Sequence, residues 1–212
     1  MNKSSTTYVL LFMLAICIVF GAGVSAVHYA TRGMLEKNET LHKNRIISRA
    51  FMLDVDGKTA HAYQQAIASA IRIDTIQGEK RNYETFYRGK TTTGEVGFVF
   101  SGIGFWDIIR GIVVLAPDRK HIVNMQILEQ KETPGLGARI EEAWFTDQFK
   151  GLEIDWSAPV GERIIIGGAE TGGAKNRLDA ITGATQTSIA LMQTLNSELD
   201  SFKKAFLKKA DD

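Results

Sequence analysis

Residues 95–128 read EVGFVFSGIGFWDIIRGIVVLAPDRKHIVNMQIL and carry the clearest signal of the fold class. Short runs rich in Val, Ile and Phe alternate here with Gly, Pro and Asp, a pattern typical of β-strands joined by turns. The pattern predicts strands over 95–100, 107–115 and 122–128, a tight turn at 116–119, and a further short strand over 163–166.

Helix-forming sequence flanks these strands on both sides. Residues 34–70 place apolar side chains at helical spacing, with a turn-like Asp-Val-Asp-Gly at 54–57. Near the carboxyl end, an apolar stripe repeats every three or four residues: Leu191, Leu195, Leu199, Phe202 and Phe206. This order of elements predicts an α+β fold, in which helices pack on an antiparallel sheet.

The amino terminus has the composition of a membrane segment. No charged residue occurs from Ser4 to Val27, and a helix of about 20 residues is long enough to cross a bilayer. A cleaved signal peptide is the alternative, because Val24-Ser25-Ala26 resembles a cleavage site. The apolar run exceeds a typical signal core, so we expect an uncleaved anchor over 1–30, a helical connecting region over 31–92 and the α+β domain over 93–212.

Composition excludes several classes of function. Lys and Arg number 25 against 24 Asp and Glu, so the chain has no overall field for binding nucleic acid. The single Cys17 can form neither an intramolecular disulfide nor a zinc or iron–sulfur site, and the four His residues are scattered. A metal centre built by the protein alone is therefore not expected.

The most informative motif is DAITGATQTS at 179–188, where the last helix is predicted to begin. In the plain interpretation Thr182 is an N-cap, and Gly183 and Ala184 are slim first-turn residues. Alternatively, the helix amino end and the hydroxyls of this segment bind a phosphate group, and a threonine hydroxyl carries a phosphoester. Asp179 would repel a phosphate unless a cation bridges them, which suggests Mg²⁺ during attachment. The hydroxyls concerned are those of Thr182, Thr185, Thr187 and Ser188.

Two further motifs contain paired glycines. The run ETPGLG at 132–137 predicts a type II turn at Pro134-Gly135, with Leu136 either exposed or held against a flat aromatic ligand. The run SGIGFWD at 101–107 is no dinucleotide fingerprint, because Asp107 stands where the third glycine is required. Taken alone, its Trp106 is expected to pack in the core.

Taken in order, Gly-x-Gly-x-Trp, Glu-Thr-Pro-Gly-Leu-Gly and Asp-x-x-Thr-Gly-Ala-Thr resemble the FMN-binding subunits of bacterial respiratory ion pumps. These are the G subunit of the Rnf complex and the C subunit of the sodium-pumping NADH:quinone reductase (Nqr). The resemblance covers about residues 89–188. It implies covalent FMN, joined through a phosphoester to Thr185 by a separate Mg²⁺-dependent flavin transferase that uses FAD.

The same resemblance assigns roles to other residues. Asp179 would serve the Mg²⁺-dependent attachment, and Thr182, Gly183 and Ala184 would shape the attachment site. The flavin contacts would come from the other two motifs: Glu132, Thr133, Leu136, Gly137 and Trp106.

The implied function is that of an electron carrier without substrate turnover of its own. Its partners would be flavin and iron–sulfur subunits of a membrane complex that moves Na⁺ or H⁺. The length of 212 residues favours the Rnf-type protein, with the C subunit of the quinone reductase as the alternative. A membrane-tethered sensor that binds FMN or another phosphate ligand non-covalently, and a plain interaction domain, are hypotheses of other classes.

Charge around the span opposes the implied location. Lys3 precedes the span, whereas the following residues are rich in Lys and Arg, which would place the large domain in the cytoplasm. Large domains cross membranes largely regardless of such charge. We therefore follow the resemblance and expect a single-pass protein of the bacterial inner membrane, with the flavin domain on the outer side.

Overall fold

The computed structural model describes residues 6–89, 91–168 and 174–211; Lys3, counted above, lies outside them. The chain divides into two compact units, Met1–Leu41 and His42–Asp212. Helix α1 (Thr6–Ala50) supplies the first unit and continues into the second. The expected anchor is therefore helical throughout its described residues, but the helix does not end at residue 30.

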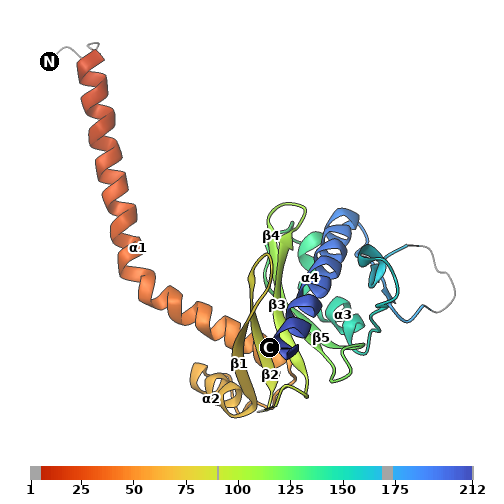
Figure 1. Cartoon of the computed structure of the whole chain (residues 1–212). Coiled ribbons are helices and arrows are strands. Elements are labelled where there is room, and N and C mark those ends of the chain that lie inside the picture. The colour runs from red at the N-terminus through yellow and green to blue at the C-terminus, as the bar shows by residue number, and fades with distance from the viewer. Residues whose placement is uncertain (1–5, 90, 169–173, 212) are drawn as a thin grey trace. The chain divides into compact units, whose positions relative to one another are not determined.

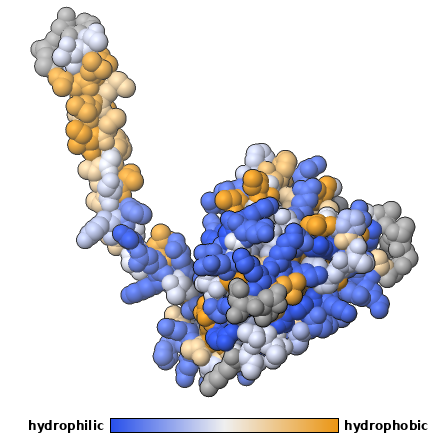
Figure 2. Space-filling model, viewed as in Figure 1, coloured by the Kyte–Doolittle hydropathy of each residue, from blue (hydrophilic) through white to orange (hydrophobic). Residues whose placement is uncertain are grey.

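Within the described residues, α1 is the one helix long and apolar enough to cross a membrane. Its apolar side chains are exposed, among them Leu10, Phe12, Val19 and Phe20. In Figure 2 this segment is a continuous hydrophobic surface. Such a surface is unfavourable in water, and this agrees with a segment that lies in lipid.

The second unit is built on a five-stranded antiparallel sheet, which confirms the predicted fold class. The strands follow one another in chain order as a simple meander (Figure 1). They are β1 (Ile71–Gln77), β2 (Asn82–Arg88), β3 (Val96–Ile103), β4 (Ile108–Leu115) and β5 (Ile122–Glu129). Each of the last three begins within one residue of its predicted start.

The region expected to be a helical connection is only partly helical. Helix α1 ends at Ala50 and α2 (Ala60–Ala70) follows; between them the backbone is left-handed at Met52 and, within the turn predicted at 54–57, at Gly57. Residues 71–88, however, form β1 and β2 and belong to the main sheet. Aromatic and β-branched side chains in IRIDTIQ and NYETFYR favour strands there. The expected boundary at residue 93 therefore divides one sheet.

Both faces of the sheet are covered. Alternate side chains on the central strands point to opposite sides, so each face carries apolar side chains that need a covering layer. The last part of α1, residue Phe51 and helix α2 cover one face, where Val99, Ile112 and Val114 are buried. Helix α4 (Thr185–Asp211) lies on the other face (Figure 1). There the ring of Phe98 stacks on that of Phe202, with 4.0 Å between centroids. The predicted stripe of α4 faces this core: Leu191, Leu195, Leu199 and Phe202 are buried and Phe206 is partly buried.

The chain between β5 and α4 forms short elements beside α4. They are η1 (Gly137–Glu141), α3 (Ala143–Thr146), η2 (Asp147–Phe149), η3 (Val160–Glu162), β6 (Ile165–Ile166) and β7 (Arg177–Leu178). The strand expected over 163–166 is thus only two residues long, and it pairs in parallel with β7 instead of joining the main sheet.

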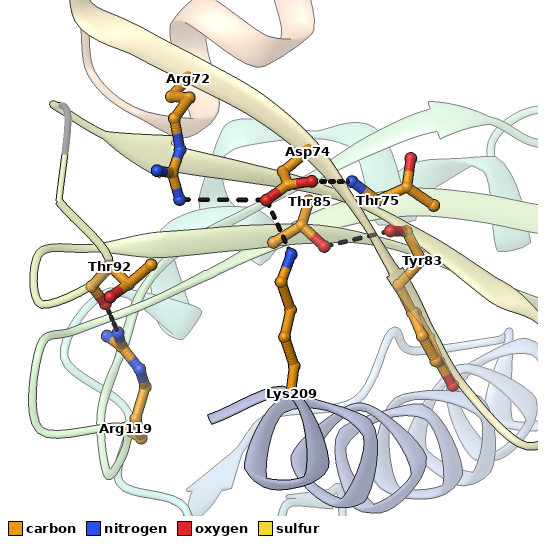
Figure 3. A network of polar contacts seen from close by, with 8 residues as sticks. All are labelled: Arg72, Asp74, Thr75, Tyr83, Thr85, Thr92, Arg119 and Lys209. Carbon is orange, nitrogen blue, oxygen red and sulfur yellow. Dashed lines mark hydrogen bonds and ion pairs between the residues drawn. The ribbon is translucent and has the colours of Figure 1, made fainter. Parts of the chain in front are cut away.

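Polar contacts tie the carboxyl end of α4 to the sheet (Figure 3). Lys209 Nζ lies 2.7 Å from Asp74 Oδ2 on β1, and this hydrogen bond holds the pKa of Asp74 below its usual value. In the predicted tight turn at 116–119, Arg119 has φ 58° and its guanidinium donates to the carbonyl of Thr92 over 2.8 Å. The turn is therefore fixed to the loop between β2 and β3.

Candidate functional site

The three sequence motifs meet at one pocket. It has a volume of about 280 Å³ and lies between the β3–β4 turn, the loop after β5 and the start of α4. Its lining residues are Phe105, Trp106, Glu132, Thr133, Leu136, Gly137, Gly183, Ala184, Thr185, Gln186 and Thr187. Three segments that are far apart in the chain thus supply one site.

The β3–β4 turn forms an aromatic wall of this pocket. The Gly104 N–H donates to the carbonyl of Asp107 over 2.8 Å and closes the turn. Phe105 and Trp106 project from it, 55% and 68% exposed, with their ring centroids 5.2 Å apart. The expectation that Trp106 packs in the core is therefore wrong, because its side chain lies exposed on the turn that joins β3 and β4.

An ion pair lies beside this wall. Lys131 Nζ is 3.1 Å from Asp107 Oδ2. A hydrogen bond from the Ile108 N–H, followed by the contact with Lys131, lowers the pKa of Asp107. Asp107 therefore stays ionised at neutral pH and ties the turn to the loop that follows β5.

The 132–137 loop has the predicted conformation. The Leu136 N–H donates to the carbonyl of Thr133 over 3.1 Å, and Gly135 has φ +75°, as a type II turn requires. Leu136 is 44% exposed at the pocket, whereas Gly137 is buried. A Cβ atom at Gly137 would lie only 2.5 Å from Thr187 Oγ1, so this position requires glycine.

The third motif differs from the predicted cap. Helix α4 begins at Thr185, and residues 181–184 form a turn in which the Ala184 N–H donates to the carbonyl of Ile181 over 3.0 Å. Gly183 has φ +83°, which keeps this segment out of the helix. The N-cap interpretation of Thr182 is therefore wrong. Ser188 Oγ instead accepts the Ile181 N–H over 3.1 Å and holds the turn against the helix.

The structure separates the four hydroxyls of this segment. Thr187 and Ser188 are buried, and their hydroxyls are engaged with Glu132 and with the carbonyl of Ala184. Thr182 is exposed but lies in a neighbouring hollow of about 500 Å³. Thr185 is exposed and lines the aromatic pocket, at the amino end of a 27-residue helix.

Asp179 also lies in the neighbouring hollow, away from the aromatic pocket. The other residues lining it are Arg139, Trp144, Gly167, Gly168, Ala180 and Thr182. The Asp179 N–H donates to Gln148 Oε1 over 2.8 Å. In the part of the chain that the structure describes, no three His, Cys, Asp or Glu side chains form a group able to hold a metal ion.

Sequence reasoning missed two residues of the pocket, Phe105 and Gln186. Phe105 adjoins Trp106 in a turn between strands, where an aromatic pair is a detectable signal. Nothing in the sequence marked Gln186, which enters the site because it occupies the first turn of α4.

Comparison with known proteins agrees with this geometry. Residues 104–200 match the family model of the FMN-binding domain. The match contains the second and third motifs and the part of the first motif from Gly104 onward. This part of the chain is similar to FMN-binding domains.

Curated relatives confirm the predicted resemblance. The C subunit of the Na⁺-translocating NADH-quinone reductase of Pasteurella multocida is 31% identical over 112 residues, which are 51% of this chain and 43% of that protein. The G subunit of an ion-translocating oxidoreductase complex of Methanosarcina acetivorans is 32% identical over 120 residues, 54% of this chain and 56% of that protein. The chain thus matches about half the length of these relatives.

A crystal structure of NqrC from Shewanella oneidensis has the same fold. The TM-score is 0.69 at 17% sequence identity, and the match covers 82% of this chain and 99% of that chain. The antiparallel sheet with its covering helices is therefore an architecture already observed by crystallography.

Proposed function

We propose that this chain is a membrane-anchored electron-transfer flavoprotein subunit of an ion-translocating Rnf-type complex, with FMN joined through a phosphoester to Thr185. The observation that carries the proposal is the position of Thr185. Its exposed side chain lines the pocket with the Phe105 and Trp106 wall, while Thr187 and Ser188 are buried and engaged. FMN supplies the electron-transfer chemistry, and the protein supplies position and exclusion.

The pocket suits the parts of FMN. First-turn amides at the amino end of α4, together with the helix dipole, favour a phosphate on Thr185. Phe105, Trp106 and Leu136 offer apolar surface to a flat ring system. Thr133, Gly137, Gly183 and Ala184 would complete the cradle, the last three being too small to obstruct close approach.

Attachment requires a separate enzyme in this proposal. The Thr185 hydroxyl oxygen bonds to the FMN phosphorus of FAD, AMP leaves, and the hydroxyl proton is released. Mg²⁺ would be brought by the flavin transferase, with Asp179 and Thr182 on the adjacent hollow as the recognition surface. Their separation from the aromatic pocket fits a role in attachment and not in holding the flavin ring.

The proposed partners and location follow from the relatives and from α1. Both curated relatives are named as subunits of ion-translocating complexes. We assign electron exchange to flavin and iron–sulfur subunits of such a complex, and ion movement to partners, because the apolar part of α1 has no acidic residue. The span would lie in the bacterial inner membrane with the flavin domain outside. The C subunit of the sodium-pumping quinone reductase is the alternative assignment.

The test is co-expression of the full chain with a flavin transferase, followed by fluorescence of the denatured protein in a gel and peptide mass analysis. We expect a fluorescent band that is lost in Thr185→Val and kept in Thr75→Val, a control at an exposed threonine of β1 that lines neither hollow. The peptide containing Thr185 should be heavier by the FMN phosphoester.

Two results would contradict the proposal. A band that persists in Thr185→Val would move the attachment to another residue. Wild-type protein that binds flavin but loses all of it on denaturation would instead support the non-covalent sensor.

A further inference from the structure

Glu132 is a buried acidic side chain at the base of the pocket, and it is only 4% exposed. Its Oε1 accepts a hydrogen bond from the backbone N–H of Trp106 over 3.0 Å, and its Oε2 accepts one from the Thr187 hydroxyl over 2.7 Å. One carboxylate therefore joins the aromatic turn to the first turn of α4.

Two glycines enclose this carboxylate closely. A Cβ atom at Gly104 would lie 2.4 Å from Oε1, and one at Gly137 would lie 2.9 Å from Oε2. Each carboxylate oxygen thus has both a hydrogen-bond donor and a glycine close to it. This arrangement does not suit a side chain whose main role is direct contact with a ligand.

We propose that Glu132 is a positioning residue, which fixes the separation between the Phe105–Trp106 wall and Thr185. The inference rests on the proposed function, because that separation matters only if a ring attached at Thr185 lies against the wall. On α4 this link is made by the side chain of Thr187, two residues after Thr185. Glu132 therefore acts on the flavin through Trp106 and Thr187.

Loss of the hydrogen bond between Thr187 and Glu132 breaks the link and leaves the Phe105–Trp106 wall in the sequence. In Thr187→Val the shape of the side chain is kept, but Glu132 Oε2 loses its donor and remains buried and unsatisfied. In Thr187→Ser the donor is kept. In Glu132→Gln the amide oxygen can accept from the backbone N–H of Trp106 and the amide nitrogen can donate to the Thr187 hydroxyl, so both hydrogen bonds of the link can be kept.

The first measurement needs no flavin. Amide hydrogen exchange, read by mass spectrometry, is followed in the peptide containing Trp106 of the full chain in detergent. We expect exchange about tenfold faster in Thr187→Val than in wild type, the fold-change expected for loss of one buried hydrogen bond. Thr187→Ser and Glu132→Gln should stay close to wild type.

The second measurement uses the flavin-loaded chain. Fluorescence anisotropy of flavin attached at Thr185 should fall in Thr187→Val and be restored in Thr187→Ser, at unchanged flavin content of the Thr185 peptide. Wild-type exchange and wild-type anisotropy in Thr187→Val would overturn the inference, as would exchange in Glu132→Gln as fast as in Thr187→Val. If Thr185 carries no flavin in any chain, the proposed function fails, and the exchange measurement still decides whether Glu132 links the two segments.

Discussion

At the scale of single residues, Gly183 shapes the site through its backbone. Its φ of +83° lies in the left-handed region, and a Cβ atom there would lie 3.2 Å from Leu136 Cδ2. The residue therefore sets both the turn before Thr185 and the space beside Leu136. The conformational freedom of this one glycine therefore decides how Thr185 lies at the pocket.

We predict that Gly183→Ala destabilises the domain by about 1–2 kcal/mol, the cost of placing a side chain in left-handed backbone. Urea unfolding of the two proteins measures this difference. Gly161→Ala is the control, because a Cβ atom at Gly161 meets no heavy atom within 4 Å and its φ is not positive. Equal unfolding midpoints for Gly183→Ala and wild type would show that the turn relaxes without strain.

The residues of the site were predictable where the motif fixes local geometry. Leu136 and the type II turn at Pro134-Gly135 follow from short-range rules, and the structure has them as predicted. Which hydroxyl of the 182–188 segment is free was not predictable, because the Thr187 hydroxyl donates to Glu132, 55 positions away in the chain. The N-cap assignment of Thr182 failed because Ser188, in the first turns of α4, holds the turn instead.

At the scale of elements, α4 is fixed to its surroundings by ion pairs as well as by its apolar stripe. Asp200 lies 2.7 Å from Arg163, in the loop before β6, and 2.9 Å from Lys204 on α4. Burial alone would raise the pKa of Asp200. The hydrogen bonds from Lys204 and Arg163 outweigh burial and leave the pKa below its usual value.

This shift predicts a pH-dependent contribution to stability. Because the pKa of Asp200 is lower in the folded than in the unfolded protein, its contribution is present above the unfolded value of about 3.9 and is lost as pH falls through the folded value. We expect Asp200→Asn to lower the free energy of unfolding by about 1–2 kcal/mol at neutral pH. The difference from wild type should shrink below pH ~4, as followed by denaturant unfolding across pH. A constant difference would assign the effect to packing.

Elements were predictable in proportion to their length and regularity. Strands β3, β4 and β5 and helix α4 follow from clear periodicity, whereas the sequence pattern predicts a helical connection where β1 and β2 lie. Charged and polar side chains such as Arg72, Asp74 and Glu84 interrupt the apolar signal in these two strands. β1 pairs with β2, and β2 pairs with β3, so their place in the sheet depends on contacts that neither strand's own pattern shows.

At the scale of the whole molecule, the unit that starts at His42 includes the last part of α1. Ile46, Ile47, Ala50 and Phe51 are buried in the cluster on one face of the sheet. That face is therefore covered by residues that precede the predicted FMN-binding domain in the chain. The sheet cannot be complete in a fragment that starts at residue 93.

We predict that a fragment of residues 42–212 folds without detergent, whereas 93–212 does not. The shorter fragment lacks β1, β2, the last part of α1 and helix α2, so Val99, Ile112 and Val114 would be exposed to water. Size-exclusion chromatography and thermal unfolding compare the two. A monomeric, cooperatively unfolding 93–212 fragment would show that the second cluster is dispensable.

If Thr185 is modified as proposed, the bond between the Ile181 N–H and Ser188 Oγ sets the order of folding and modification. It spans the attachment segment and exists only when the turn and the first turn of α4 have both formed. An enzyme that modifies Thr185 in this arrangement meets a folded surface and not a linear peptide. Newly made chains would therefore form the sheet and pack α4 on it before flavin is attached, and misfolded chains would carry no flavin.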